Sequence, residues 1–148
     1  MSTPPFSVAF HHATPHGVIS AIHLPPEPIE ISEKIFNNLP PQEREHAQAL
    51  KGFRQMQFIG GRIALRHSIA QLGMRVGSML PNHRGAPQLP EHLIGSISHK
   101  DTLAVGMAAR ATGGTLGVDL EIYEPERNRI ARKVLTEGER VAVDALPD

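Results

Sequence analysis

Alternating and helical patterns of apolar residues divide the chain into an N-terminal β-hairpin, a helical middle and a second β-rich segment. Residues 6–10 and 17–24 are β-compatible and predict a hairpin, with residues 11–15 as the break between its strands. The character becomes helical from Pro40 onward. Pro41 suits the first turn of a helix, and we expect that helix to end at Gly52.

The longest helix is predicted over residues 53–73, where apolar residues recur at helical spacing and Gly73 provides a stop. Gly60 and Gly61 interrupt it. Two glycines cost about 2 kcal/mol relative to two alanines inside a helix. Either another segment approaches the backbone closely at this point, or the helix bends.

The same helix carries a stripe of arginines. Arg54, Arg62 and Arg66 are separated by eight and four residues, which places their guanidinium groups on one side. The stripe is either a solvated basic face or a phosphate clamp, because guanidinium groups bind phosphate oxygens bidentately. Arg84 follows in a tight Arg-Gly-Ala-Pro turn and presents one more cation.

A β-meander packed on the long helix is predicted next, which makes the fold class α+β. Its strands are expected at residues 94–97, 103–109 and 116–122, with a turn at residues 99–102 and another at Gly113 and Gly114. Asp119 and Glu121 are two residues apart in the third strand. Their carboxylates should therefore point to one face, roughly 7 Å apart along the backbone.

Composition narrows the classes of function. The 148 residues correspond to one ordinary domain, and equal numbers of acidic and basic residues give no global field that would favour nucleic acid. Without cysteine there is no thiol nucleophile or cysteine-based zinc site. The start lacks signal-peptide features, and no apolar run reaches the roughly 18 residues needed to cross a bilayer. We expect a soluble cytoplasmic protein whose anion site, if present, is local.

Carboxylates, a histidine and arginines together suggest a polyphosphate site. Asp119 and Glu121 supply the hard oxygen ligands that Mg²⁺ prefers, although an exposed strand face would look the same. His99 alone would be a structural residue, but beside Ser98 at a strand end it can donate to a phosphate. The sequence contains neither a P-loop nor a G-x-S-x-G elbow. The histidines of the N-terminal hairpin match no metal-binding spacing and are expected at the surface or on an edge strand.

Three motifs, in their order and spacing, resemble the Sfp/EntD-type 4′-phosphopantetheinyl transferases, and most closely the enterobactin-synthase-like branch. They are FRQMQFIGGRIALRHSIAQLG, RGAPQLPEHLIGSISHK and LGVDLE, within about residues 40–123. The resemblance implies an α+β fold of two related halves with coenzyme A between them. This chain corresponds to the first half: residues 1–122 as the N-terminal subdomain, and residues 123–148 as a linker and the start of a truncated second subdomain.

The resemblance also implies a reaction, the Mg²⁺-dependent transfer of 4′-phosphopantetheine from coenzyme A to a serine of an acyl, peptidyl or aryl carrier protein. Such proteins serve siderophore or other secondary-metabolite biosynthesis. By resemblance, Asp119 and Glu121 are the catalytic, metal-binding pair on the pyrophosphate. The nucleotide end of coenzyme A is assigned to Arg54, Arg62, Arg84, Ser98 and His99.

Members of the family continue with an aromatic-x-x-K-E-x-x-x-K motif, whose first glutamate is a metal ligand or base and whose lysine is tied to catalysis. Residues 130–148 do not match it. Three hypotheses follow. The chain is a truncated or split transferase; or it is a half that binds coenzyme A or a nucleotide and needs a separate second half; or it is an inactive structural remnant with a solvated arginine stripe.

A half-domain leaves one face of its core uncovered, so we predict that the chain forms homodimers or aggregates unless a second half covers that face. Analytical ultracentrifugation together with binding of an apolar dye measures this. A monodisperse monomer that binds no dye would contradict the prediction.

Overall fold

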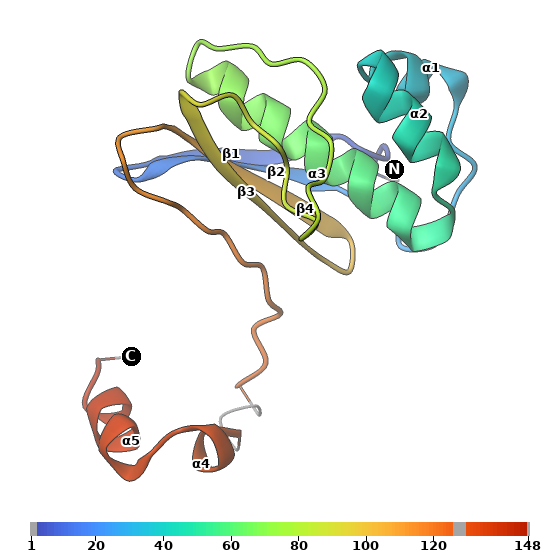
Figure 1. Ribbon diagram of the computed structural model, residues 1–148. Coiled ribbons are helices and arrows are strands. Elements are labelled where there is room, and N and C mark those ends of the chain that lie inside the picture. Colours follow the sequence, from blue (N-terminus) through green and yellow to red (C-terminus); the bar gives the residue numbers. More distant parts are fainter. Residues whose placement is uncertain (1–2, 126–129, 148) are drawn as a thin grey trace.

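A long helix packed across one face of a four-stranded antiparallel sheet forms the core of the chain (Figure 1). The computed structural model describes residues 3–125 and 130–147. Its elements are β1 (Val8–Thr14), β2 (Gly17–His23), α1 (Glu33–Asn37), α2 (Pro41–Ala49), α3 (Gly52–Gln71), β3 (Leu93–Lys100), β4 (Leu103–Arg110), α4 (Ala131–Val134) and α5 (Glu137–Asp144). The strand order is β1-β2-β4-β3. The expected α+β class is confirmed.

The N-terminal hairpin is confirmed, but the predicted break at residues 11–15 is wrong for most of its length. β1 continues to Thr14, and only Pro15 and His16 form the turn. The Thr14 hydroxyl donates to the Gly17 carbonyl and accepts from the His16 and Gly17 amides, which closes this turn. His11 and His12 are exposed on the edge strand β1, as expected, and no group of three or more metal-ligating side chains occurs among the described residues.

The helical middle begins and ends differently from the prediction. α2 begins at Pro41 as predicted, but it ends at Ala49. Gly52 does not end that helix; with a φ of +59° it begins α3, because a left-handed residue allows the chain to reverse between the two helices. The short helix α1, capped by the Ser32 side chain, was not predicted. Gly73, with a φ of +74°, follows the end of α3 as predicted.

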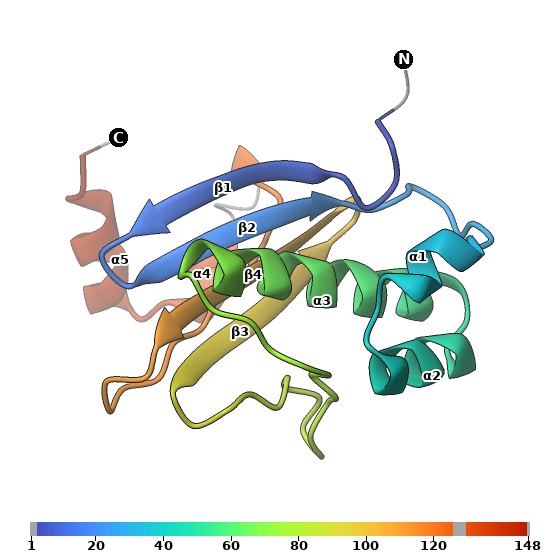
Figure 2. The same ribbon diagram turned by 90° about the horizontal axis from the view of Figure 1, so that it is seen from above.

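Close packing between α3 and the sheet explains the glycine pair. A Cβ on Gly60 would overlap the Leu24 side chain, and one on Gly61 would lie 2.7 Å from the Ile97 Cγ2 atom. The first of the two alternatives, a close approach to the helix backbone, is therefore the correct one. On the sheet side, a Cβ on Gly106 of β4 would overlap the Leu65 backbone. Helix and strand backbones are thus nearly in contact (Figure 2).

Two buried serines bridge α3 and the sheet where their backbones come closest. The Ser68 hydroxyl of α3 is 2.8 Å from the Ser20 hydroxyl of β2 and donates to the Gly106 carbonyl at 2.7 Å. Both serines are fully buried. Apolar residues surround this contact, including Ile22, Ile59, Leu65 and Ile69, each of them 0% exposed.

The predicted third strand of the meander is wrong. Residues 116–122 form no strand; instead, the Val118 and Leu120 amides donate to the Ser96 and Ser98 hydroxyls at 3.2 and 3.1 Å. These serines alternate with the helix-facing residues of β3, so their side chains lie on the sheet face away from α3. The segment therefore covers that face and does not extend the sheet.

The C-terminal residues contribute little to the core. α4 and α5 contain no buried residue, and Figure 1 shows both apart from the sheet. α5 begins with a capping box, in which the Glu139 carboxylate accepts from the Thr136 backbone and side chain and its pKa is lowered by both bonds. Within the described residues, no helix has the length and apolar character required of a membrane span.

Substituting Gly106→Ala is predicted to lower the free energy of unfolding by about 3 kcal/mol or to prevent folding, because the methyl group would meet backbone atoms that cannot rotate away. Gly114→Ala is the matched control, since nothing lies within 4 Å of that site. Urea denaturation measures both variants. Equal stability of the two would contradict the close approach of α3 and β4.

Candidate anion-binding site

A cavity of about 610 Å³ lies between α2, α3, the turn at residues 81–87 and the middle and end of β3. Such a volume suits a small-molecule ligand. Its lining contains five basic side chains: His46, Arg54, Arg62, Arg84 and His99. No carboxylate lines it within the described part of the chain. The net charge of the protein is zero, so this is a strictly local concentration of positive charge.

Arg62 is the most constrained of these cations. Its residue is 4% exposed, its Nε donates to the Met79 carbonyl, and its guanidinium carbon lies 4.5 Å from the centre of the Phe58 ring. One of its two terminal nitrogens, Nη2, is buried and has no hydrogen-bond partner among the described residues. Leaving a buried donor unpaired costs about 1–3 kcal/mol, and more when it is charged. An acceptor bound in the cavity would remove that cost.

Burial lowers the pKa of the Arg62 guanidinium to about 10, while the Glu43 carboxylate raises this pKa and Arg66 lowers it. The guanidinium therefore stays charged at neutral pH in spite of its burial. A buried positive charge with a free donor favours an anionic ligand over a neutral one.

Two aromatic side chains form the wall beside Arg62. The His46 ring of α2 lies 4.6 Å from the Phe58 ring of α3, measured between centroids. Phe58 in turn lies against the Arg62 guanidinium. The sequence had indicated Phe58 only as an apolar helix position, and His46 had given no signal. A histidine six residues before the start of α3 carries no recognisable spacing.

Arg54 and Arg84 stand at the exposed rim of the cavity. Arg54 projects from the first turn of α3. Arg84 sits in the predicted tight turn, where the Asn82 side-chain oxygen accepts from the Arg84 and Ala86 amides at 2.8 and 3.1 Å. Gly85, with a φ of +83°, completes the turn. This local bonding fixes the backbone that presents Arg84.

Ser98 and His99 lie on opposite faces of β3, because side chains alternate along a strand. His99 lines the cavity. Ser98 instead donates to the Asp119 carboxylate at 3.0 Å and accepts from the Leu120 amide at 3.1 Å. The structure thus brings Arg54, Arg62, Arg84 and His99 together and places Ser98 with the carboxylates.

Asp119 and Glu121 lie along the second face of β3. Asp119 is bonded to Ser98, and a Glu121 oxygen is 3.2 Å from the Lys100 ammonium group. Ser98 and Lys100 are alternate residues of the strand, so both carboxylates follow the same face. Neither lines the basic cavity. β3 is an edge strand, and the cavity and the carboxylates flank it from its two faces.

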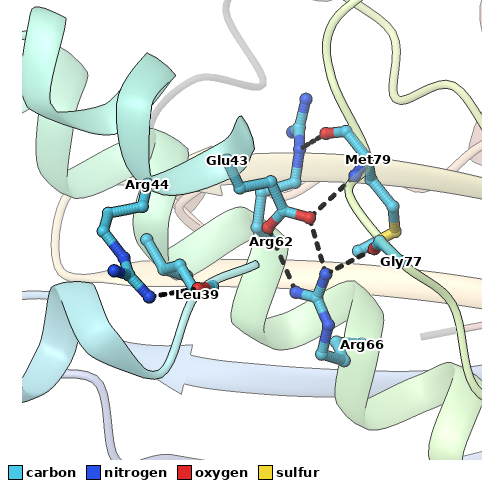
Figure 3. Close-up of polar contacts among 7 residues, drawn as sticks. All are labelled: Leu39, Glu43, Arg44, Arg62, Arg66, Gly77 and Met79. Atoms are coloured by element: carbon cyan, nitrogen blue, oxygen red, sulfur yellow. Dashed lines mark hydrogen bonds and ion pairs between the residues drawn. The ribbon is translucent and has the colours of Figure 1, made fainter. Parts of the chain in front are cut away.

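Arg66 does not line the cavity, although it shares the stripe with Arg54 and Arg62. Its guanidinium forms a bidentate pair with Glu43 of α2, at 2.6 and 3.2 Å, and also donates to the Gly77 carbonyl (Figure 3). Glu43 is fully buried and accepts from the Met79 amide at 2.7 Å. The stripe is therefore neither a solvated face nor a uniform clamp, because each arginine has a different environment.

Comparison with known proteins gives a consistent result. Residues 42–109 match the family model of the 4′-phosphopantetheinyl transferase N-terminal domain. The 4′-phosphopantetheinyl transferase Svp of Streptomyces mobaraensis is 29% identical over 119 residues, which cover 74% of this chain and 48% of the relative. The family model and this relative are thus both of 4′-phosphopantetheinyl transferases. The chain spans about half the length of this curated relative.

A solved structure is also similar, a holo-(acyl-carrier-protein) synthase from Bacillus anthracis in complex with coenzyme A (3′,5′-ADP). The TM-score is 0.49 at 28% sequence identity, over 64% of this chain and 92% of that one.

The Glu43–Arg66 pair gives a stability prediction. Arg66→Met would leave a buried carboxylate without its countercharge, and it is expected to lower the free energy of unfolding by about 3 kcal/mol. The double variant Glu43→Gln with Arg66→Met removes both charges and keeps an acceptor for the Met79 amide. It should recover most of the loss in urea denaturation. A single variant as stable as the wild type would show that the pair is unimportant.

Proposed function

We propose that the chain carries the nucleotide-binding part of an Sfp/EntD-type 4′-phosphopantetheinyl transferase, and that its basic cavity binds phosphates of coenzyme A. The observation that carries this proposal is the Arg62 guanidinium, which is buried and charged and whose Nη2 has no partner among the described residues. It lies in a cavity lined by other basic side chains and, within the same residues, by no carboxylate. The match to the transferase family supports it, because residues 42–109 include all five residues expected at the nucleotide end.

Phosphate is the ligand chemistry that fits this lining best. Several guanidinium groups around one cavity repel one another unless an anion of high charge density neutralises them. Coenzyme A offers a ribose phosphate and a pyrophosphate, so different cations can bind different phosphates. His99 is assigned to the same ligand from the cavity itself, and Ser98 from the other face of the edge strand.

We further propose that Asp119 and Glu121 hold Mg²⁺ on the pyrophosphate. The donor set fits this ion, which takes one or two carboxylates and completes its shell with water and substrate phosphate oxygens. The Lys100 ammonium group is paired with Glu121, and its charge reduces the repulsion between the Asp119 and Glu121 carboxylates on this face of β3. A bound Mg²⁺ would neutralise charge on the phosphates during transfer.

The proposed reaction is transfer of 4′-phosphopantetheine to a serine of a carrier protein, with 3′,5′-ADP as the other product. The nucleophile belongs to the carrier, so the contribution of this chain is positioning and charge neutralisation. The assignment of residues 1–122 to a first subdomain and of residues 123–148 to a linker and second subdomain is part of the same proposal, as is the cytoplasmic location.

A second candidate function is a half that binds coenzyme A and pairs with a separate half for catalysis. The apolar side chains of the C-terminal helices favour it. Val134 of α4, Val141 of α5 and Leu146, which follows α5, are each at least 66% exposed, so this part of the chain presents apolar surface that nothing in the described structure covers. Such surface is typical of an interface.

Titration with coenzyme A tests the cavity. Arg62→Met is expected to weaken binding by about tenfold or more, the loss typical of a charge-assisted hydrogen bond. Arg75→Met is the matched control, because Arg75 is an exposed arginine that does not line the cavity. Isothermal titration calorimetry measures both. Absence of coenzyme A binding at millimolar ligand, or equal losses in the two variants, would contradict the proposal.

The metal assignment has its own test. The double variant Asp119→Asn with Glu121→Gln should abolish the gain in coenzyme A affinity that Mg²⁺ produces, and should leave the metal-free affinity within about twofold. If Mg²⁺ strengthens binding equally in the variant, these carboxylates do not hold the metal. Mass spectrometry of a carrier protein incubated with coenzyme A, Mg²⁺ and the chain then distinguishes the transferase from the binding half.

A further inference from the structure

We propose that Glu43, which does not contact the cavity, is a positioning residue that sets the geometry of Arg62 for the anion. The proposal rests on the proposed function of the cavity and names one more residue on which that function depends. Glu43 acts through the backbone of Met79: it accepts a hydrogen bond from the Met79 amide, while the carbonyl of the same residue accepts one from Arg62 (Figure 3).

The relay consists of two successive hydrogen bonds. The Met79 amide donates to Glu43 Oε2 at 2.7 Å, and the Met79 carbonyl accepts from Arg62 Nε. Glu43 and Met79 are both 0% exposed, and Arg62 is 4% exposed. Water therefore does not compete at this relay, and the orientation of the residue that carries both bonds depends on its protein partners.

Arg66 and core packing make the relay rigid. The Arg66 guanidinium grips both carboxylate oxygens of Glu43 and also donates to the Gly77 carbonyl at 2.9 Å. The Met79 side chain is buried in the apolar cluster that includes Leu65 and Ile69. α2, α3 and the chain around Met79 are thereby fixed to one another. Arg62 is bonded to Met79 and is therefore held in a fixed position as well.

These contacts hold the Arg62 guanidinium in one position and leave its Nη2 available. Its Nε is occupied by Met79 and its flat face by Phe58, which leaves the buried Nη2 for a ligand. Without the Glu43 acceptor, the Met79 amide has lost its hydrogen bond, and the backbone on both sides of the Met79 Cα is less firmly held, including the carbonyl that binds Arg62. The Arg62 side chain would keep its charge but would adopt several orientations. Ligand binding would then be weaker, because it would include the entropy cost of ordering this side chain.

A matched pair of double variants isolates the relay. Glu43→Met with Arg66→Met removes the acceptor without leaving an unpaired charge, and Glu43→Gln with Arg66→Met differs only in keeping an acceptor for the Met79 amide. In the full chain, calorimetric titration with coenzyme A should show about tenfold weaker binding for the methionine pair, and the glutamine pair should restore most of it. Equal affinities of the two pairs would overturn the proposal.

A double-mutant cycle distinguishes positioning from general damage to the fold. In an Arg62→Met background, the two double variants should bind coenzyme A equally, because the residue through which Glu43 acts has been removed. Circular dichroism at the titration temperature establishes that each variant is folded. A remaining difference of about tenfold in that background would overturn the proposal, since Glu43 would then act without Arg62.

A measurement on the free protein separates this inference from the proposed function. In ¹⁵N NMR spectra, the Arg62 Nε–H proton should exchange slowly with solvent in the wild type and the glutamine pair, and rapidly in the methionine pair. That result combined with no binding of coenzyme A to the wild type would support the relay and contradict the proposed ligand. Slow exchange in all three proteins would overturn the relay whatever coenzyme A does.

Discussion

The buried carboxylate of Glu43 is the interaction on which the site depends. It holds the Arg66 guanidinium and the Met79 amide at once, and so joins α2, α3 and the chain that leads toward β3. A buried charge of this kind is stable only with its countercharge and with hydrogen bonds to both of its oxygens. Because that condition is met, the basic cavity beside it has a fixed wall. Arg62 can remain buried although its Nη2 has no partner in the described part of the chain.

Close packing supplies the second constraint. The α3 backbone lies against β4 at Gly106 and against Leu24 and Ile97 at its own glycine pair. This proximity sets the distance between α3 and β3, and thus brings His99 of β3 to the same cavity as Arg54 and Arg62 of α3. A bulkier residue at these glycines would push α3 away from the sheet. It would thereby separate the basic side chains of the cavity from one another without contacting them.

The sequence predicted the features that depend on local patterns. The hairpin, the long helix with its stop at Gly73, and the turn that carries Arg84 all follow from spacing and backbone preferences. Of the five residues assigned to the nucleotide end, four line one cavity, because the motif fixes their helix and strand positions. Ser98 does not join them, since adjacent residues of a strand face opposite ways.

The remaining features depend on tertiary contacts that no spacing encodes. Glu43 has the pattern of an ordinary charge at a helix start, and only its burial under Arg66 shows its role. Apolar and polar residues alternate over residues 116–122 as in a strand. The Val118 and Leu120 amides, however, donate hydrogen bonds to serine hydroxyls of β3 and not to backbone carbonyls, so the segment covers a face of the sheet. The crossing places the carboxylates of Asp119 and Glu121, which explains why their spacing alone left their location open.

The most direct test of the central claim is a crystal structure of the chain with 3′,5′-ADP. The account predicts a phosphate oxygen within hydrogen-bonding distance of Arg62 Nη2, with the Met79 carbonyl still bound to Nε. A nucleotide bound at another place, with Arg62 Nη2 still unpaired, would contradict it.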